Sequence, residues 1–121
     1  MLGLIVCATL IVVDGDTVKC DGQNLRDMGD GAPFVSGYDT PETRGSKCKA
    51  ESQAGQQAKA RMAELIKLPG LTIEDSGEVD RGGRPLVVLR LADGTTIGGR
   101  LVKEGYARVW TPEYKADWCG N

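Results

Sequence analysis

The chain has 121 residues, of which 40% are hydrophobic and 26% are charged, with a formal net charge of −2. These values predict one globular domain over residues 1–121 with its own core and no membrane-spanning segment. The slightly acidic charge excludes proteins that hold nucleic acid on a broad basic surface. The absence of histidine excludes Ser-His and Cys-His nucleophilic mechanisms and the usual zinc sites.

The first strands are expected on either side of the turn Asp14-Gly15-Asp16, because residues 8–13 and 17–20 are apolar or β-branched. The opening residues 1–13 lack the basic start and cleavage spacer of a signal peptide and are read as a strand. Any export signal is therefore expected outside this sequence. A third strand begins near Asn24, and residues 30–33 interrupt it with a loop signature.

A change of period predicts the main helix over residues 47–67. Leu68-Pro69-Gly70 ends this helix, and further strands are expected over 71–75 and 84–91, followed by a short helix over 98–104. One face of the main helix is expected in the core, formed by Ala50, Ala54, Ala58, Met62, Leu65 and Ile66. These elements predict a mainly β, α+β fold, a five-stranded OB-type barrel that is partly open.

Four cysteines indicate two disulfides and an oxidising compartment, either secreted or periplasmic. Three pairings are possible from the sequence. We favour Cys7 with Cys20 across the first hairpin and Cys48 with Cys119 at the end of the chain. The alternative is four buried thiols in a cytosolic protein.

Two acidic turns carry the candidate catalytic and metal-binding groups. Pro41 keeps Thr40 extended, so Asp39 and Glu42 are held in a rigid bend. We expect this bend to meet the first hairpin turn, where Asp16, Asp39 and the carbonyl of Thr40 would bind Ca²⁺ or Mg²⁺. Glu42 would then lie beside the cation as a general base. Each turn alone also has a purely structural explanation, because Asp, Gly and Pro are common in turns.

Arg84 and Arg26 are the candidate phosphate ligands, because a guanidinium presents a planar fork that matches two phosphoryl oxygens. For either arginine the alternative is a solvated surface charge. Trp110 and Tyr114 are candidates for stacking on a nucleobase, and the alternative for both is packing on the outer face of the barrel.

The motifs V-D-G-D-T-V, D-T-P-E-T, D-R-G-G-R, D-G-T-T-I and L-V-K-E-G-Y-A together resemble the staphylococcal-nuclease-like (thermonuclease) family over essentially the whole chain. The resemblance implies an OB-fold and Ca²⁺-dependent hydrolysis of DNA and RNA. It also implies calcium ligation by Asp16, Asp39 and the Thr40 carbonyl, a general base at Glu42 and a phosphate contact from Arg84.

The family's second arginine normally stands five residues before the D-T-P-E aspartate, where this chain has Phe34. An eight-residue insertion over 30–37 aligns Arg26 with that arginine instead. We prefer this alignment, because Arg26 follows a strand-like stretch and the insertion begins with a loop signature. The inserted loop is expected to reshape the cleft, with Asp27 or Asp30 as possible sources of additional ligand charge.

The leading interpretation is therefore a monomeric, exported, Ca²⁺-dependent endonuclease that cuts DNA and RNA with little sequence specificity. The alternative is a catalytically weak OB-fold module that binds nucleic acid or protein. A third interpretation is a disulfide-stapled structural domain whose acidic turns are only turns.

Overall fold

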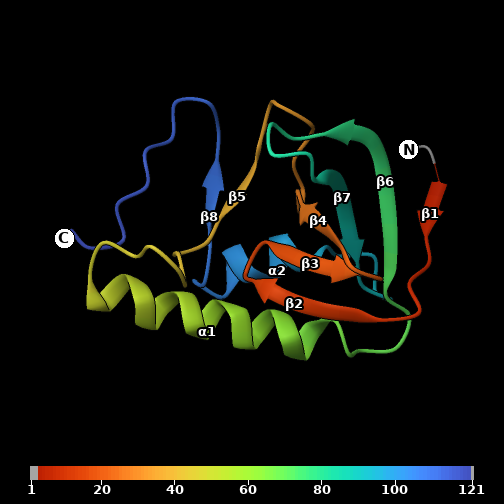
Figure 1. Ribbon diagram of the computed structural model, residues 1–121, viewed down its shortest axis with the longest axis horizontal. Helices are drawn as coiled ribbons and strands as arrows, with labels where there is room; N and C mark the ends of the chain where they lie inside the picture. Colours follow the sequence, from red (N-terminus) through yellow and green to blue (C-terminus); the bar gives the residue numbers. More distant parts are fainter. Residues whose placement is uncertain (1–2, 121) are drawn as a thin grey trace.

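The computed structural model describes residues 3–120 and contains a six-stranded sheet, a two-stranded ribbon and two helices (Figure 1). The sheet has the order β1-β6-β7-β4-β3-β2, with only β4 and β7 parallel, and β5 pairs with β8. The elements in chain order are β1 (Gly3–Ile5), β2 (Leu10–Asp14), β3 (Thr17–Cys20), β4 (Gln23–Asp27), β5 (Gly37–Asp39), α1 (Lys49–Leu65), β6 (Thr72–Val79), β7 (Pro85–Arg90), α2 (Ile97–Lys103) and β8 (Arg108–Trp110).

The predicted OB-like α+β class is confirmed, although the sheet stays open, with β1 and β2 at its edges. The apolar opening, expected as a single strand, is divided into β1 and β2. At the division, the backbone N–H groups of Ala8 and Thr9 donate to the Asp21 carboxylate at 3.1 and 2.7 Å. These bonds lower the pKa of Asp21. The same two donors are therefore not available to a sheet at this point.

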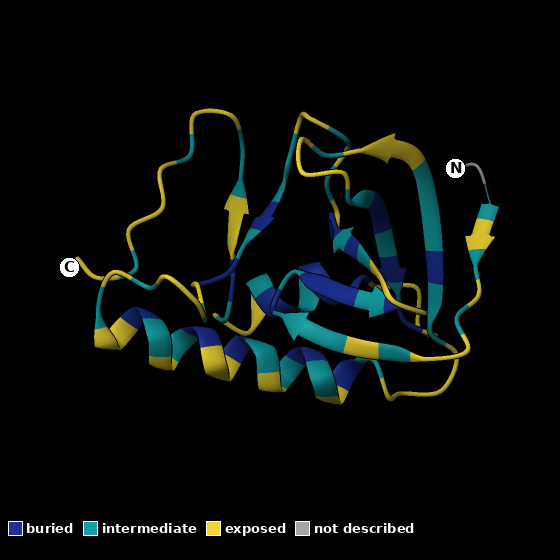
Figure 2. Cartoon of the chain, in the orientation of Figure 1, coloured by how far each residue is buried: buried dark blue, intermediate teal, exposed yellow. Residues whose placement is uncertain are grey.

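The core lies between the large sheet and the two helices, and α1 runs along β2 (Figure 1). Figure 2 shows the buried side of α1 facing the sheet. The predicted helix face is correct at Ala58, Met62 and Leu65. It is wrong at Ala50, which is exposed, while Glu51 beside it is buried. The alanine pattern failed there because the start of α1 packs on polar backbone, as described below.

Both helices begin at a side-chain cap. Cys48 Sγ accepts from the backbone N–H of Glu51 at 3.3 Å, so α1 starts two residues later than expected. Thr96 Oγ1 accepts from the N–H of Gly99 at 2.9 Å and starts α2. Capping satisfies backbone donors that have no partner within the helix.

The two disulfides form with the predicted pairing. Cys7 joins Cys20 with a Cα–Cα distance of 5.4 Å, and Cys48 joins Cys119 with a distance of 6.0 Å. The second bond attaches the end of the chain to the start of α1 (Figure 1). Within residues 3–120, no helix has the length and apolar character needed to cross a membrane.

Candidate functional site

The two acidic turns meet, as expected, through Gly15 and Thr40. A Cβ placed on Gly15 would lie 2.7 Å from Cγ2 of Thr40, so the threonine side chain rests directly on the glycine. The hydroxyl of Tyr38 lies 3.0 Å from the carbonyl oxygen of Gly15 and 2.9 Å from Oδ2 of Asp27, and its single proton is shared between these two acceptors. Only a residue without a side chain permits this approach, which brings Asp16 toward the bend that carries Asp39.

The first two turns of α1 (Lys49–Leu65) support the Asp39–Glu42 bend. A Cβ on Gly55 would lie 2.7 Å from the carbonyl oxygen of Glu42, so the helix backbone packs on the bend. The buried carboxylate of Glu51 accepts from the N–H of Lys47 at 2.7 Å and from that of Glu42 at 3.4 Å. Neither Gly55 nor Glu51 was predicted from the sequence. The available signal was the position of Glu51 three residues after the N-cap, which is the capping-box spacing.

Arg26 reaches the acidic turn and forms an ion pair with Asp16, with 3.4 Å between NH2 and Oδ2. The same nitrogen donates to the carbonyl oxygen of Tyr38 at 2.8 Å. The Asp16 and Arg26 side chains are 13% and 25% exposed. Water screens this partly buried ion pair less than an exposed one. The pair therefore holds Arg26 against the turn more firmly than an exposed ion pair would.

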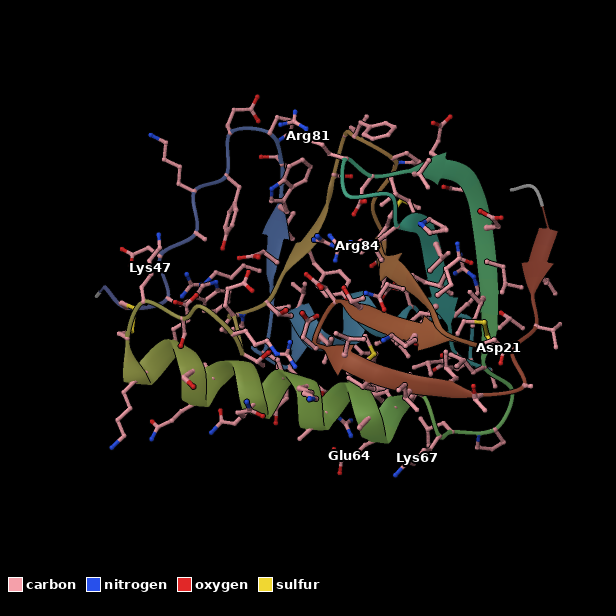
Figure 3. All side chains as sticks on the ribbon, viewed as in Figure 1. Asp21, Lys47, Glu64, Lys67, Arg81 and Arg84 are labelled. Atoms are coloured by element: carbon pink, nitrogen blue, oxygen red, sulfur yellow. A yellow bond between two sulfur atoms is a disulfide. The ribbon has the colours of Figure 1, made fainter. Side chains whose placement is uncertain are left out.

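Arg84 is connected to the same carboxylate through a hydroxyl. Its NH1 donates to Thr17 Oγ1 at 2.8 Å, and Thr17 Oγ1 donates to Asp16 Oδ1 at 2.8 Å. Asp80 orients the guanidinium, since its Oδ2 accepts from Nε at 2.7 Å. Figure 3 shows Arg84 in the middle of the molecule, between β4 and β5, and Arg81 above it on the same turn. Two arginines from distant segments therefore converge on Asp16.

The site carries an excess of negative charge. Burial, together with the side-chain hydrogen bond to Asp16 and the charge of Asp16, raises the pKa of Asp14 to about 7, although the backbone N–H of Asp16, which donates to Asp14 Oδ1 at 3.0 Å, acts in the opposite direction. Partial removal from water raises the pKa of Glu42, and the charges of Asp16 and Asp39 raise it further. Like charges held close together disfavour ionisation, so this site favours a cation.

Asp39 is held by the segment that follows β8. Its Oδ2 accepts from the hydroxyl of Tyr114 at 3.0 Å and from Nε1 of Trp118 at 2.9 Å. Burial and the neighbouring Asp39 raise the pKa of Tyr114, so the phenol remains protonated and is the donor. Tyr114 therefore points into the site with its hydroxyl, while Trp110 lies elsewhere, as described next.

Trp110 lines a cavity of about 590 Å³ that also includes Arg26, Arg81 and Phe34. Phe34 lies in the inserted loop, is 60% exposed and has a φ of 64°. Bulky side chains rarely adopt this left-handed conformation, and such outliers concentrate at functional sites. The sequence analysis discounted Phe34, which had no recognisable signal there.

Asp27, the last residue of β4, and Asp30 in the inserted loop both bond to groups of the fold. Asp27 is buried, and its carboxylate accepts from the backbone N–H groups of Gly29 and Leu89 and from the hydroxyl of Tyr38. Asp30 instead accepts from Thr96 Oγ1 at 2.8 Å, at the start of α2. The expectation that either carboxylate adds to a metal site is therefore wrong, since both support the fold.

The possible ligand atoms at the site are of the type that hard cations prefer. In the described part of the chain, no three His, Cys, Asp or Glu side chains are close enough together to hold a metal ion by themselves. Asp16, Asp39 and the carbonyl of Thr40 supply oxygens only, which Ca²⁺ and Mg²⁺ prefer, and these ions commonly complete their coordination with water or substrate oxygens. The raised pKa of Glu42 reflects negative charge that a cation would offset. The residues therefore fit a hard cation bound jointly with water and substrate.

Replacing Gly15 with Ala is expected to lower the free energy of unfolding by about 1–3 kcal/mol, the usual cost of overpacking. The added methyl would meet Thr40, which is 4% exposed and has little room to turn away. Urea unfolding measures the loss. Gly37→Ala is the control, because its Cβ would meet only the carbonyl oxygen of Met28 at 3.9 Å. Equal stability of the two variants would contradict the close approach of the turns.

Comparison with known families identifies one match. The model of the family described as "Staphylococcal nuclease homologue" matches residues 34–118. This range contains Asp39, Thr40, Glu42 and Arg84, and it leaves out Asp16 and Arg26. No curated protein matches the chain.

Proposed function

Because the chain belongs to the family of staphylococcal nuclease homologues, we propose that it is a Ca²⁺-dependent endonuclease. Its substrates are the phosphodiester bonds of DNA and RNA, cut with little sequence specificity. The observation that carries the proposal is the convergence of Arg26 and Arg84 on Asp16, beside the bend that bears Glu42. A binding module or a structural domain has no need to gather two arginines around one carboxylate next to a second carboxylate.

The cation is assigned to Asp16, Asp39 and the carbonyl of Thr40. When bound, it supplies positive charge that draws the scissile phosphate to the acidic turns and offsets charge that develops on its oxygens. Arg26 and Thr17 already occupy the carboxylate of Asp16, so cation and arginine share this group. A weakened contact between Arg26 and Asp16 would leave the guanidinium available to the phosphate.

Glu42 is proposed as the general base. Its side chain is exposed, and its raised pKa makes its carboxylate a stronger base. The carboxylate takes a proton from a water molecule as the water oxygen bonds to phosphorus. The ester bond opposite the attacking oxygen then breaks, and the departing oxygen is protonated from solvent.

Arg84 and Arg26 are proposed to stabilise the negative charge that grows on the phosphoryl oxygens. Asp80 and Thr17 already orient the Arg84 guanidinium, so little reorganisation is needed when the phosphate binds. Preorganised donors of this kind contribute more than mobile ones, since their orientation does not have to be established during the reaction.

We assign the nucleotides next to the scissile phosphate to the cavity between the inserted loop and Trp110. Arg26 lines both this cavity and the acidic site, so a base in the cavity would lie next to a phosphate at Asp16. Phe34 and Trp110 offer aromatic surfaces on which any base stacks, which suits low sequence specificity. Tyr114 becomes available for stacking on a base when its hydroxyl leaves Asp39, to which it donates at 3.0 Å.

Replacing Phe34 with Ala is expected to raise KM for single-stranded DNA about 10-fold, because one base–aromatic stack contributes about 1–3 kcal/mol. The free energy of unfolding should stay the same or rise, since the exposed ring has a φ of 64°. Steady-state cleavage kinetics measure the change. Val35→Ala is the matched control, because Val35 is 65% exposed in the same loop. An unchanged KM in the Phe34 variant would remove this loop from the substrate site.

The two disulfides support an oxidising location, secreted or periplasmic. We assign the protein there as a single-domain monomer acting on DNA and RNA. Size-exclusion chromatography with light scattering tests the oligomeric state.

Digestion of single-stranded DNA and of RNA with Ca²⁺, with Mg²⁺ or with a chelator tests the activity. Cleavage that requires Ca²⁺ and stops with the chelator is the expected result. If the protein bound DNA or RNA but did not cleave it with any of these metals, the alternative interpretation, an OB-fold binding module, would be correct. If the protein neither cleaved nor bound nucleic acid, the remaining interpretation would be a disulfide-stapled structural domain.

A further inference from the structure

The candidate ligand Asp39 is held from outside its own strand. Both hydrogen bonds to its Oδ2 come from the segment after β8, from Tyr114 at 3.0 Å and Trp118 at 2.9 Å. No described residue donates a hydrogen bond to its Oδ1. Two donors on one oxygen set the plane of a carboxylate and leave the second oxygen as the ligand.

Trp118 is held by a cation–π contact with Arg108, and its two neighbours in the chain, Asp117 and Cys119, are also fixed. The guanidinium of Arg108 stacks over its ring, with 3.9 Å from Cζ to the ring centroid. Arg108 NH1 also donates to the carbonyl oxygen of Asp117 at 2.9 Å, and Arg108 pairs directly with Asp39 across β5 and β8. Cys119, the next residue along the chain, is bonded to Cys48.

The segment has few other means of staying in place. It follows β8 without a further helix or strand within the described residues, and most of its residues are exposed (Figure 2). In Figure 1 it descends from β8 to the start of α1, where Cys48 holds it. The contacts with Asp39 and Arg108, together with the disulfide, therefore carry most of its order.

We propose that Tyr114 and Trp118 are positioning residues that orient the Asp39 carboxylate for the cation, and that the Cys48–Cys119 bond keeps them there. The inference rests on the proposed function, because Asp39 needs this orientation only if it binds a metal. Residues that orient a metal ligand typically change metal affinity by about 10–100-fold when they are replaced. Reduction of the disulfide in a less oxidising compartment would weaken the site through the same contacts.

Calorimetric titration with Ca²⁺ alone, without nucleic acid, tests the proposal. Trp118→Phe and Tyr114→Phe each remove one donor and keep an aromatic ring. The double variant is expected to bind Ca²⁺ about 10–100-fold more weakly. In cleavage assays, the half-saturating Ca²⁺ concentration should rise by the same factor. Tyr106→Phe is the matched control, because the hydroxyl of Tyr106 bonds to no side chain or backbone group within residues 3–120.

A second pair of replacements tests the tether. Cys48→Ser with Cys119→Ser breaks the disulfide and keeps a good N-cap for α1, since serine caps helices well. This variant should also lose Ca²⁺ affinity, and thermal unfolding measured in parallel identifies any loss that comes from unfolding alone.

The outcomes separate the two proposals. Unchanged Ca²⁺ affinity in the folded double variant, with wild-type binding and cleavage intact, would overturn the positioning role and leave the nuclease assignment standing. A wild-type protein that neither binds Ca²⁺ nor cleaves would overturn both. An affinity loss in Tyr106→Phe equal to that of the double variant would also overturn the positioning role.

Discussion

Replacing Glu42 with Gln is expected to lower kcat for strand cleavage by about 10²–10⁴-fold, the usual contribution of a positioned general base. Glutamine has nearly the same shape but cannot take a proton from water. The exposed Glu42 side chain makes no hydrogen bond to a described residue, so the fold should be retained. Loss of one negative charge beside Asp16 and Asp39 should affect Ca²⁺ affinity much less than kcat.

Single-turnover digestion of single-stranded DNA at saturating Ca²⁺ measures this effect directly. Glu113→Gln is the matched control, since Glu113 is exposed in the segment after β8. This replacement removes the same charge from a residue outside the proposed catalytic group. Full activity in the Glu42 variant would assign the base to another group or the cleavage to a contaminating nuclease. Equal losses in both variants would indicate a general charge effect.

The second large effect is expected at Asp27, on stability. Asp27→Ala should lower the free energy of unfolding by about 3–5 kcal/mol, because buried donors left without an acceptor cost about 1–3 kcal/mol each. The N–H groups of Gly29 and Leu89 lie 3.0 and 3.1 Å from Oδ1 and would lose this acceptor, whereas the hydroxyl of Tyr38, 2.9 Å from Oδ2, could still donate to the carbonyl oxygen of Gly15. Domains are typically stable by only about 5–15 kcal/mol, so the loss is a large share.

Urea unfolding at neutral pH measures the loss as a fall in the transition midpoint. Asp27→Asn is the control, because its amide oxygen can still accept from both backbone donors. Burial raises the pKa of Asp27 to about 6, which means that the core disfavours the charged carboxylate. The amide of asparagine is neutral and avoids this cost. The Asn variant should therefore be much more stable than the Ala variant. If the two were equally unstable, these hydrogen bonds would not be the source of the loss.

Asp27 also links the core to the candidate site. Its partner Tyr38 donates to the carbonyl oxygen of Gly15 in the acidic turn, and the carbonyl of Tyr38 accepts from Arg26. We therefore expect Asp27→Ala to reduce activity even in its folded fraction. A chain of buried hydrogen bonds of this kind transmits a local loss to its neighbours.

From the amino-acid sequence alone, the class of the fold and a set of candidate site residues could be predicted. The 3.6-residue period of 47–67 predicted α1, because one helix face must be apolar to pack, and alternating runs around turn residues predicted most of the large sheet. The two disulfides followed from the even count of cysteines and their places in the chain. The helix and strand patterns are local, so they can be read from neighbouring residues, whereas the pairing of Cys48 with Cys119 joins residues 71 apart and was one of three possible pairings.

Contacts between segments far apart in the sequence became known only from the folded structure. β5 and β8 pair although about seventy residues separate them, and three-residue strands carry too little pattern to be recognised alone. Glu51 is buried and Gly55 packs on the bend, against the alanine pattern, because the bend offers N–H groups and backbone atoms there. The bonds from Tyr114 and Trp118 to Asp39 likewise depend on a chain path that a disulfide closes over seventy-one residues. Which groups meet across such distances depends on the packing of the whole chain, which no local pattern records.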